Sequence, residues 1–89
     1  MAQVKNWHVD ILIGERDGQT RAEARLCPAD EVTLTGEGWA RLNPKDNDVP
    51  EIGDELAVAR SLSDLAHRLL HAAVDDIEGM THENVHLSR

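Results

Sequence analysis

The sequence predicts an α+β fold in which a three-stranded antiparallel meander is followed by one long helix. Three segments, at about 7–14, 20–27 and 32–42, alternate between apolar and polar residues with the period of two that is typical of strands. Short turn signals separate them, as direct hairpin connections require. Residues 54–78 then carry apolar side chains at helical spacing. With 89 residues, the chain has room for a single domain, 1–89.

The first expected strand, 7–14, is amphipathic and predicts a half-buried strand. Its alternate residues are large and apolar and share one side: Trp7, Val9, Ile11 and Ile13. Asp17-Gly18 follows as a turn, because glycine adopts a positive φ without strain. The two segments that flank this turn should therefore form a hairpin.

The second and third expected strands, 20–27 and 32–42, present mostly small residues on the inward side. Pro28 ends the second strand because proline has no N–H to give to the sheet. Gly36 and Gly38 both fall at inward positions of the third strand. Glycine packs nothing there, so we expect a bulge, or a helix or partner backbone that approaches very closely.

Residues 43–53 contain two prolines and several Asp and Asn residues, which predicts a loop before the helix at 54–78. A helix of that length measures about 38 Å, whereas a strand of seven or eight residues spans only about 25 Å. The apolar stripe would overhang the sheet, and a second copy of the chain is the simplest surface to cover it. Gly79 is expected to end the helix, and 80–89 to form a loose polar tail.

Composition limits the function classes. Nine Lys and Arg against 17 Asp and Glu give a net charge of −8, which argues against a generally basic nucleic-acid binder but not against a local basic patch. Cys27 is the only cysteine and cannot form an intramolecular disulfide. The chain has neither a signal-peptide pattern at its start nor an apolar run of membrane-spanning length. We therefore expect a cytoplasmic protein without a membrane partner.

Two histidines, His67 and His71, lie four residues apart and would share one face of the helix. Such a pair could hold a metal, but Arg68 stands where a metalloprotease motif places glutamate, and its charge opposes a cation. Solvated histidines are the favoured interpretation, so we expect no metal and no cofactor. No motif indicates catalytic residues or a small-molecule substrate, and a non-enzymatic protein is expected.

The outward side of the sheet is the candidate interaction face. It gathers three guanidinium groups and an indole: Arg21, Arg25, Trp39 and Arg41. Arginine with an aromatic side chain serves both RNA binding and protein interfaces. Glu23 and Glu37 share this face and could simply pair with the arginines. A solvated face, a protein interface and a nucleic-acid interface all remain open at this point.

Several stretches resemble a family of small actinobacterial proteins of unknown function: TRAEARL at 20–26, GEGWARLNP at 36–44, VPEIGDELAVARSLSDL at 49–65, and the short matches at 76–78 and 81–82. The resemblance implies a β-β-β-α subunit like double-stranded-RNA-binding domains, in an intertwined homodimer. Some members of that family are linked to hypoxia and dormancy, and one is likened in shape to ribosome hibernation factors. The family has no established catalytic residues.

Two hypotheses about function follow. The first is a homodimeric, stress- or dormancy-associated factor that binds the ribosome or RNA, supported by the resemblance and by the arginines of the outward face. The alternative is an acidic dimeric protein–protein interaction module that binds no nucleic acid. The net charge and Trp39 fit this alternative equally well.

Overall fold

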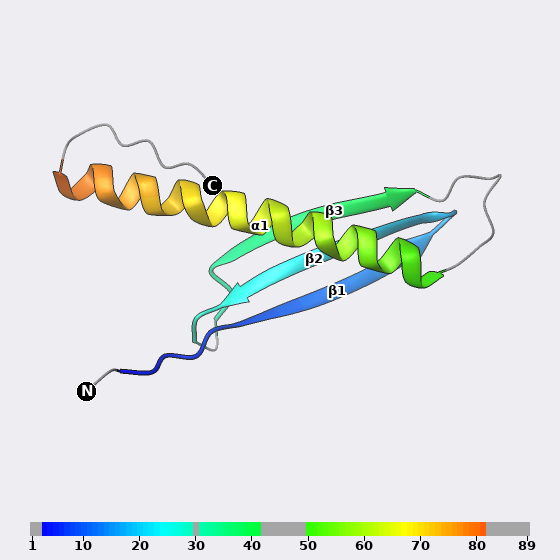
Figure 1. Ribbon diagram of the computed structural model, residues 1–89, viewed down its shortest axis with the longest axis horizontal. Helices are drawn as coiled ribbons and strands as arrows, with labels where there is room; N and C mark the ends of the chain where they lie inside the picture. The colour runs from blue at the N-terminus through cyan, green and yellow to red at the C-terminus, as the bar shows by residue number, and fades with distance from the viewer. Residues whose placement is uncertain (1–2, 30, 42–49, 82–89) are drawn as a thin grey trace.

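The computed structural model describes residues 3–29, 31–41 and 50–81. The chain forms β1 (His8–Arg16), β2 (Gln19–Cys27) and β3 (Leu34–Arg41), followed by α1 (Pro50–Thr81) (Figure 1). The strands lie in the order β1-β2-β3 and both pairs are antiparallel. The predicted fold class, a three-stranded meander followed by one long helix, is therefore confirmed.

The turn between β1 and β2 fixes the register of the sheet. Asp17 and Gly18 both have positive φ angles, 53° and 75°, which is the two-residue turn whose twist matches a hairpin. Arg16 consequently pairs with Gln19, and the pairing continues without a bulge to His8 and Cys27. Every side chain of the hairpin is thereby assigned to one face of the sheet.

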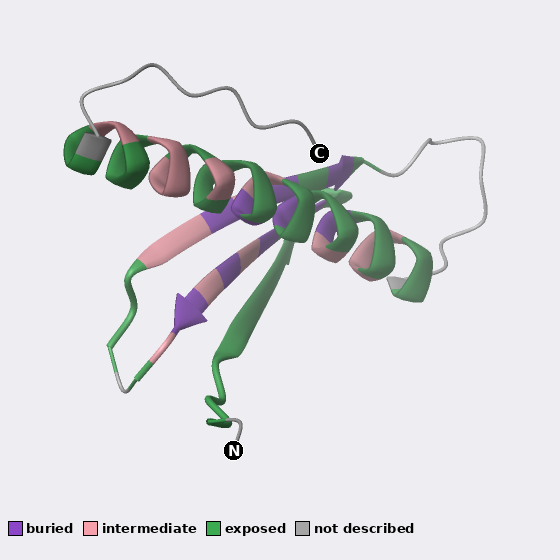
Figure 2. Ribbon diagram, turned by 60° about the vertical axis from the view of Figure 1, so that its left-hand side comes forward, coloured by how far each residue is buried: buried purple, intermediate pink, exposed green. Residues whose placement is uncertain are grey.

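Helix α1 lies across one face of the sheet, over β2 and β3 (Figures 1 and 2). The core between them consists of small and aliphatic residues in two clusters: Ala22, Ala40 and Ala57, and Ala24, Leu26 and Leu65. A Cβ at Gly36 would lie 2.5 Å from the carbonyl oxygen of Ser61, and one at Gly38 would lie 2.7 Å from the carbonyl carbon of Arg60. Both inward glycines thus lie against the backbone of α1.

The prediction of a half-buried first strand is wrong, because all nine residues of β1 are exposed (Figure 2). Val9, Ile11 and Ile13 face the same side as the buried alanines of β2, yet they remain 37%, 38% and 47% exposed. The helix axis lies over β2 and β3 because the glycines of β3 and the alanines of β2 allow its backbone to approach closely. The helix therefore passes beside β1, and its apolar row is uncovered in the single chain.

The side chains of α1 also occupy the free edge of β3. Asp64 Oδ2 accepts the backbone N–H of Glu37 at 2.9 Å, and Arg60 Nη1 donates to the carbonyl oxygen of Trp39 at 2.6 Å. A strand edge with free N–H and C=O groups invites another strand, and side chains that bind those groups prevent this. No described residue does the same for the free edge of β1.

The helix is longer than expected at both ends. It begins at Pro50 rather than 54, because a proline in the first turn has the required φ and needs no N–H partner. It continues through Gly79 to Thr81, since one exposed glycine weakens a helix without ending it. Within the described residues, no helix combines the length and the apolar character needed to span a membrane. The sequence predicts the loop at 43–53 and the tail at 80–89; residues 50–53 and 80–81 belong to α1, and residues 42–49 and 82–89 lie outside the described residues.

Candidate interaction surface on the open face of the sheet

The face of the sheet opposite α1 carries the residues that the sequence indicates as a candidate interaction face. The register places Arg21 of β2 directly between Gly14 of β1 and Trp39 of β3. Arg41 stands one alternate position further along β3, opposite Gln19. Arg21, Trp39 and Arg41 therefore meet at the end of the sheet that is closed by the Asp17-Gly18 turn.

These residues line an open hollow of about 560 Å³, which we name the hairpin hollow. Its wall is formed by Gly14, Glu15, Arg16, Asp17, Gln19, Arg21, Trp39 and Arg41. Gly14 helps to keep it open, because no atom lies within 4 Å of the place where a Cβ would stand. The hollow thus combines three guanidinium groups with one indole ring.

The three arginines of the hollow differ in how far they are neutralised. Arg21 makes a charge-assisted hydrogen bond to Glu37, lies 3.5 Å from a carboxylate oxygen of Glu23, and has its Cζ 5.9 Å from the centre of the Trp39 ring. Arg16 is 3.8 Å from Asp17, but both side chains are more than 90% exposed and such a pair contributes little. Arg41 is the one arginine of the hollow without an ion-pair partner among the described residues.

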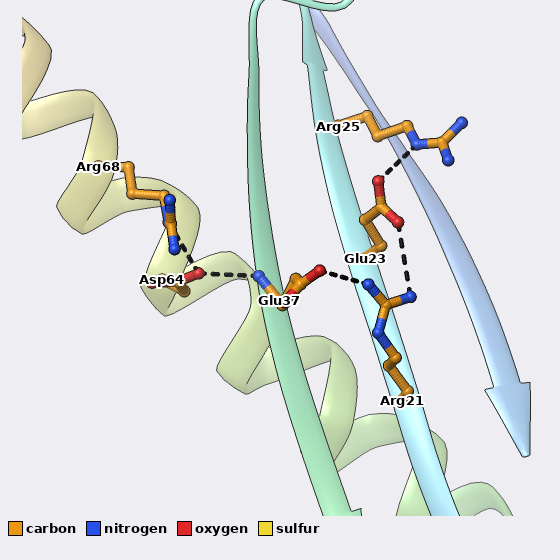
Figure 3. A network of polar contacts seen from close by, with 6 residues as sticks. All are labelled: Arg21, Glu23, Arg25, Glu37, Asp64 and Arg68. Carbon is orange, nitrogen blue, oxygen red and sulfur yellow. Dashed lines mark hydrogen bonds and ion pairs between the residues drawn. The ribbon is translucent and has the colours of Figure 1, made fainter. Parts of the chain in front are cut away.

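Arg25 lies outside the hollow, although the sequence groups it with the others. Its Nε donates to Glu23 at 2.9 Å, and Glu23 in turn faces Arg21, so the three form a row along β2 (Figure 3). The hydrogen bond from Arg25 is the main cause that lowers the pKa of Glu23. The structure therefore brings together Arg21, Trp39 and Arg41 and leaves Arg25 in an ion pair.

The arrangement can hold a flat, negatively charged group. An exposed indole offers a stacking surface, while guanidinium groups around it can bind phosphate or carboxylate oxygens in pairs. Sequence reasoning missed Gly14 and Arg16 as parts of this site. The signal was available, because an Asp-Gly turn at 17–18 implies a register that places Gly14 opposite Arg21.

The histidine pair lies on α1, well away from the hollow. His67 Nε2 and His71 Nε2 are 3.2 Å apart, and the rings meet edge to face with centroids 4.7 Å apart. Both residues are exposed. Such a pair offers two imidazole nitrogens on one side and no third ligand within the described part of the chain.

Comparison with known proteins gives the chain a family. The sequence model of the Rv2632c-like family matches residues 5–86. The chain belongs to this family. It is 55% identical over 84 residues to the uncharacterized protein Mb1767 of Mycobacterium bovis, covering 94% of this chain and 88% of that protein. It is 51% identical over 81 residues to the uncharacterized protein Rv2632c of Mycobacterium tuberculosis, covering 91% and 86%.

A solved structure of this Rv2632c-like family has the same fold. The crystal structure of Rv2632c superimposes with a TM-score of 0.81 at 49% sequence identity, over 92% of this chain and 96% of that one. The mycobacterial relatives agree with the actinobacterial family that the sequence resembles. The names of these relatives state no biochemical activity, so a non-enzymatic function stays a prediction.

Proposed function

We propose that this protein is a non-enzymatic homodimer that binds RNA through the hairpin hollow and associates with the ribosome. The observation that carries the proposal is the convergence of Arg16, Arg21 and Arg41 around Trp39 on an acidic chain. A hibernation-type role in stress or dormancy belongs to the same proposal, and its support is the family resemblance.

Charge distribution supports a local RNA site despite the net charge of −8. The carboxylates of α1, including Glu51, Asp75 and Asp76, lie on the helical layer, whereas the hollow opens on the other face of the sheet, where three arginines outnumber Glu15 and Asp17 in its wall. Unpaired RNA bases stack on aromatic rings while guanidinium groups bind the adjoining phosphates. A single-stranded loop of ribosomal RNA therefore matches the hollow better than a regular duplex.

The dimer is supported by apolar surface that the single chain leaves uncovered. Val9, Ile11 and Ile13 form an exposed row on β1, and Leu69 and Ile77 lie on the exposed part of α1. The free edge of β3 is occupied by Asp64 and Arg60, so β1 is the edge left for a second copy. In this arrangement each copy covers the β1 row of the other, as a two-fold interface requires.

A protein–protein interaction module is the second candidate, favoured by a specific observation. Arg21 is already bound to Glu37 and lies close to Glu23, which reduces the positive charge offered to phosphate. Trp39 is 44% exposed, and an aromatic residue beside an arginine is typical of protein interfaces. In this second function, binding depends on Trp39 and responds weakly to salt.

Co-sedimentation with purified ribosomes at low and high salt separates the two functions. We expect the wild-type protein to pellet with ribosomes at low salt and to be released at high salt, because phosphate contacts displace counterions. Arg41→Glu should weaken binding about tenfold or more, since it replaces the least neutralised cation of the hollow with a negative charge.

The matched control is Arg25→Glu, an equal change of charge on the same face but outside the hollow. It should retain most of the binding. Equal losses in both variants, or no loss in Arg41→Glu, would contradict the hollow as an RNA site. Salt-insensitive binding to a ribosomal protein, abolished by Trp39→Ala, would support the second function instead.

A further inference from the structure

Three metal-ligating side chains converge at the open end of the β1–β2 hairpin, away from the hairpin hollow. His8 stands directly across from Cys27, and Asp10 lies two residues further along β1 on the same face. The distance from His8 to Gly14 along β1 is about 20 Å, so this cluster and the hollow are separate sites. The antiparallel pairing of β1 with β2 holds all three residues in a fixed arrangement.

The spacing of the ligand atoms approaches that of a coordinated metal. Asp10 lies in the middle, with Oδ1 3.9 Å from His8 Nε2 and Oδ2 3.8 Å from Cys27 Sγ. All three ligand atoms lie within 4.8 Å of one another. Around a tetrahedral Zn²⁺, nitrogen, oxygen and sulfur ligands stand about 3.3–3.6 Å apart. Small side-chain rotations would therefore bring the three ligand atoms within bonding distance of one ion.

We propose that His8, Asp10 and Cys27 form a zinc-binding site with three protein ligands. Imidazole, carboxylate and thiolate are all ligands that Zn²⁺ prefers. One ionised carboxylate and one thiolate balance the two positive charges of the ion, so the complex is neutral. This inference is independent of RNA binding and revises the expectation from sequence that the protein binds no metal.

The surroundings of the cluster suit an accessible site rather than a closed structural one. The Cys27 residue is only 4% exposed, whereas the side chains of His8 and Asp10 are 55% and 62% exposed. An ion held by these three would keep a fourth position toward solvent, where water or a small ligand binds. Zinc sites with three protein ligands and one open position have this form.

Two neighbouring features set the conditions for binding. Cys27 Sγ lies 3.8 Å from Asp10 Oδ2, placed as a weak S–H donor to that carboxylate. Because the thiolate is the form that binds zinc, a Zn–S bond forms as the S–H proton is released to water. Arg25 stands opposite Asp10 with its Nε bound to Glu23, and its positive charge interacts with Asp10 and Cys27, so the bound zinc must outweigh this nearby cation.

Calorimetric titration of the tag-free protein with Zn²⁺ tests the site, supported by Co²⁺ absorption spectra. We expect one ion per chain, proton release on binding, and a thiolate-to-cobalt charge-transfer band. His8→Gln and Cys27→Ser should each weaken binding at least tenfold, because even the loss of an outer-shell partner costs roughly 10–100-fold. His8 is exposed, so its replacement leaves the core unchanged.

The matched control is the double variant His67→Ala and His71→Ala, which removes the other close histidine pair. It should bind zinc as the wild type does. Zinc binding that survives in His8→Gln and Cys27→Ser, or that disappears in the control, would overturn the assignment. Titration in the absence of RNA keeps the outcome separate from that of the proposed function.

Discussion

At the scale of single residues, two glycines decide how closely the helix approaches the sheet. Gly36 and Gly38 lie on β3 under α1, and a Cβ on either would fall within 3 Å of helix backbone atoms. Backbone cannot move aside as a flexible side chain can, so the cost of a larger residue is high. The small core of alanines is a consequence of the same close approach.

The first prediction at this scale concerns Gly38→Ala. The added methyl group would clash with the α1 backbone near Ala57 and Ser61. We expect a loss of about 1–3 kcal/mol in the free energy of unfolding, measured by chemical denaturation. Gly14→Ala is the matched control, because nothing lies within 4 Å of its Cβ position. A Gly38→Ala variant as stable as the control would contradict the close approach.

At the scale of elements, Asp64 joins the helix to the strand it covers. Its Oδ2 accepts the N–H of Glu37 at 2.9 Å and also a hydrogen bond from Arg68 Nε at 3.1 Å (Figure 3). The hydrogen bond from the Glu37 backbone is the main cause that lowers the pKa of Asp64 below its ordinary value of 3.8. The bond is therefore made by the ionised carboxylate.

The pH dependence of stability follows from this lowered pKa. The folded state binds the Asp64 proton less readily than the unfolded state, so the contribution is fully present above a pH of about 4. It is lost as the pH falls through the folded-state pKa. We expect the unfolding free energy to fall more steeply between pH 5 and 2 in the wild type than in Asp64→Asn, measured by denaturation at each pH.

The control for removal of a helix charge is Asp75→Asn, at an exposed position of α1. It should keep the wild-type slope. If the unfolding free energies of the wild type and Asp64→Asn fell in parallel with pH, the hydrogen bond to β3 would contribute nothing to the loss of stability in acid.

At the scale of the whole molecule, α1 covers the β3 side of the sheet and leaves the β1 side exposed. Helix α1 has 32 residues and measures about 48 Å, while β3 has eight and spans about 27 Å. The helix covers β2 and β3, occupies the outer edge of β3, and extends past the sheet. Uncovered apolar side chains therefore lie on β1 and along α1, both where it covers the sheet (Ile52, Leu56 and Leu62) and beyond it (Leu69 and Ile77).

The dimer proposed from this asymmetry predicts the effect of Ile11→Glu. Ile11 lies in the middle of the uncovered row of β1, and a buried carboxylate there would be costly in a dimer but harmless in a monomer. We expect light scattering to give twice 9.9 kDa for the wild type and a folded 9.9 kDa species for the variant.

Leu12→Glu is the matched control, since Leu12 is the next residue of the same strand, is similarly exposed, and faces the opposite side. It should remain dimeric. A wild-type chain that is monomeric at micromolar concentration would refute the dimer. Dissociation of the Leu12→Glu variant alone would place the interface on the other face of the sheet.

The amino-acid pattern alone predicts the elements and the two faces of the sheet. Alternation with a period of two assigned Ala22 and Ala24 inward and Arg21 outward, and the Asp17-Gly18 turn set the register of the hairpin. These properties are local, because the side-chain period and turn chemistry are decided within a few residues. The same locality explains why helical spacing predicts the helix itself but not its ends, at Pro50 and Thr81.

Which strands the helix covers, and which polar groups meet, depends on the packing of the whole chain. Periodicity gives β1 and β2 similar apolar faces, yet the close approach over Gly36 and Gly38 places α1 over β2 and β3 and leaves β1 exposed. Pairing across strands joins Arg21 of β2 to Glu37 of β3, whereas Arg41 has no ion-pair partner among the described residues. It also unites Asp10 with Cys27, 17 residues away. Such contacts depend on register and side-chain position, which no single segment encodes.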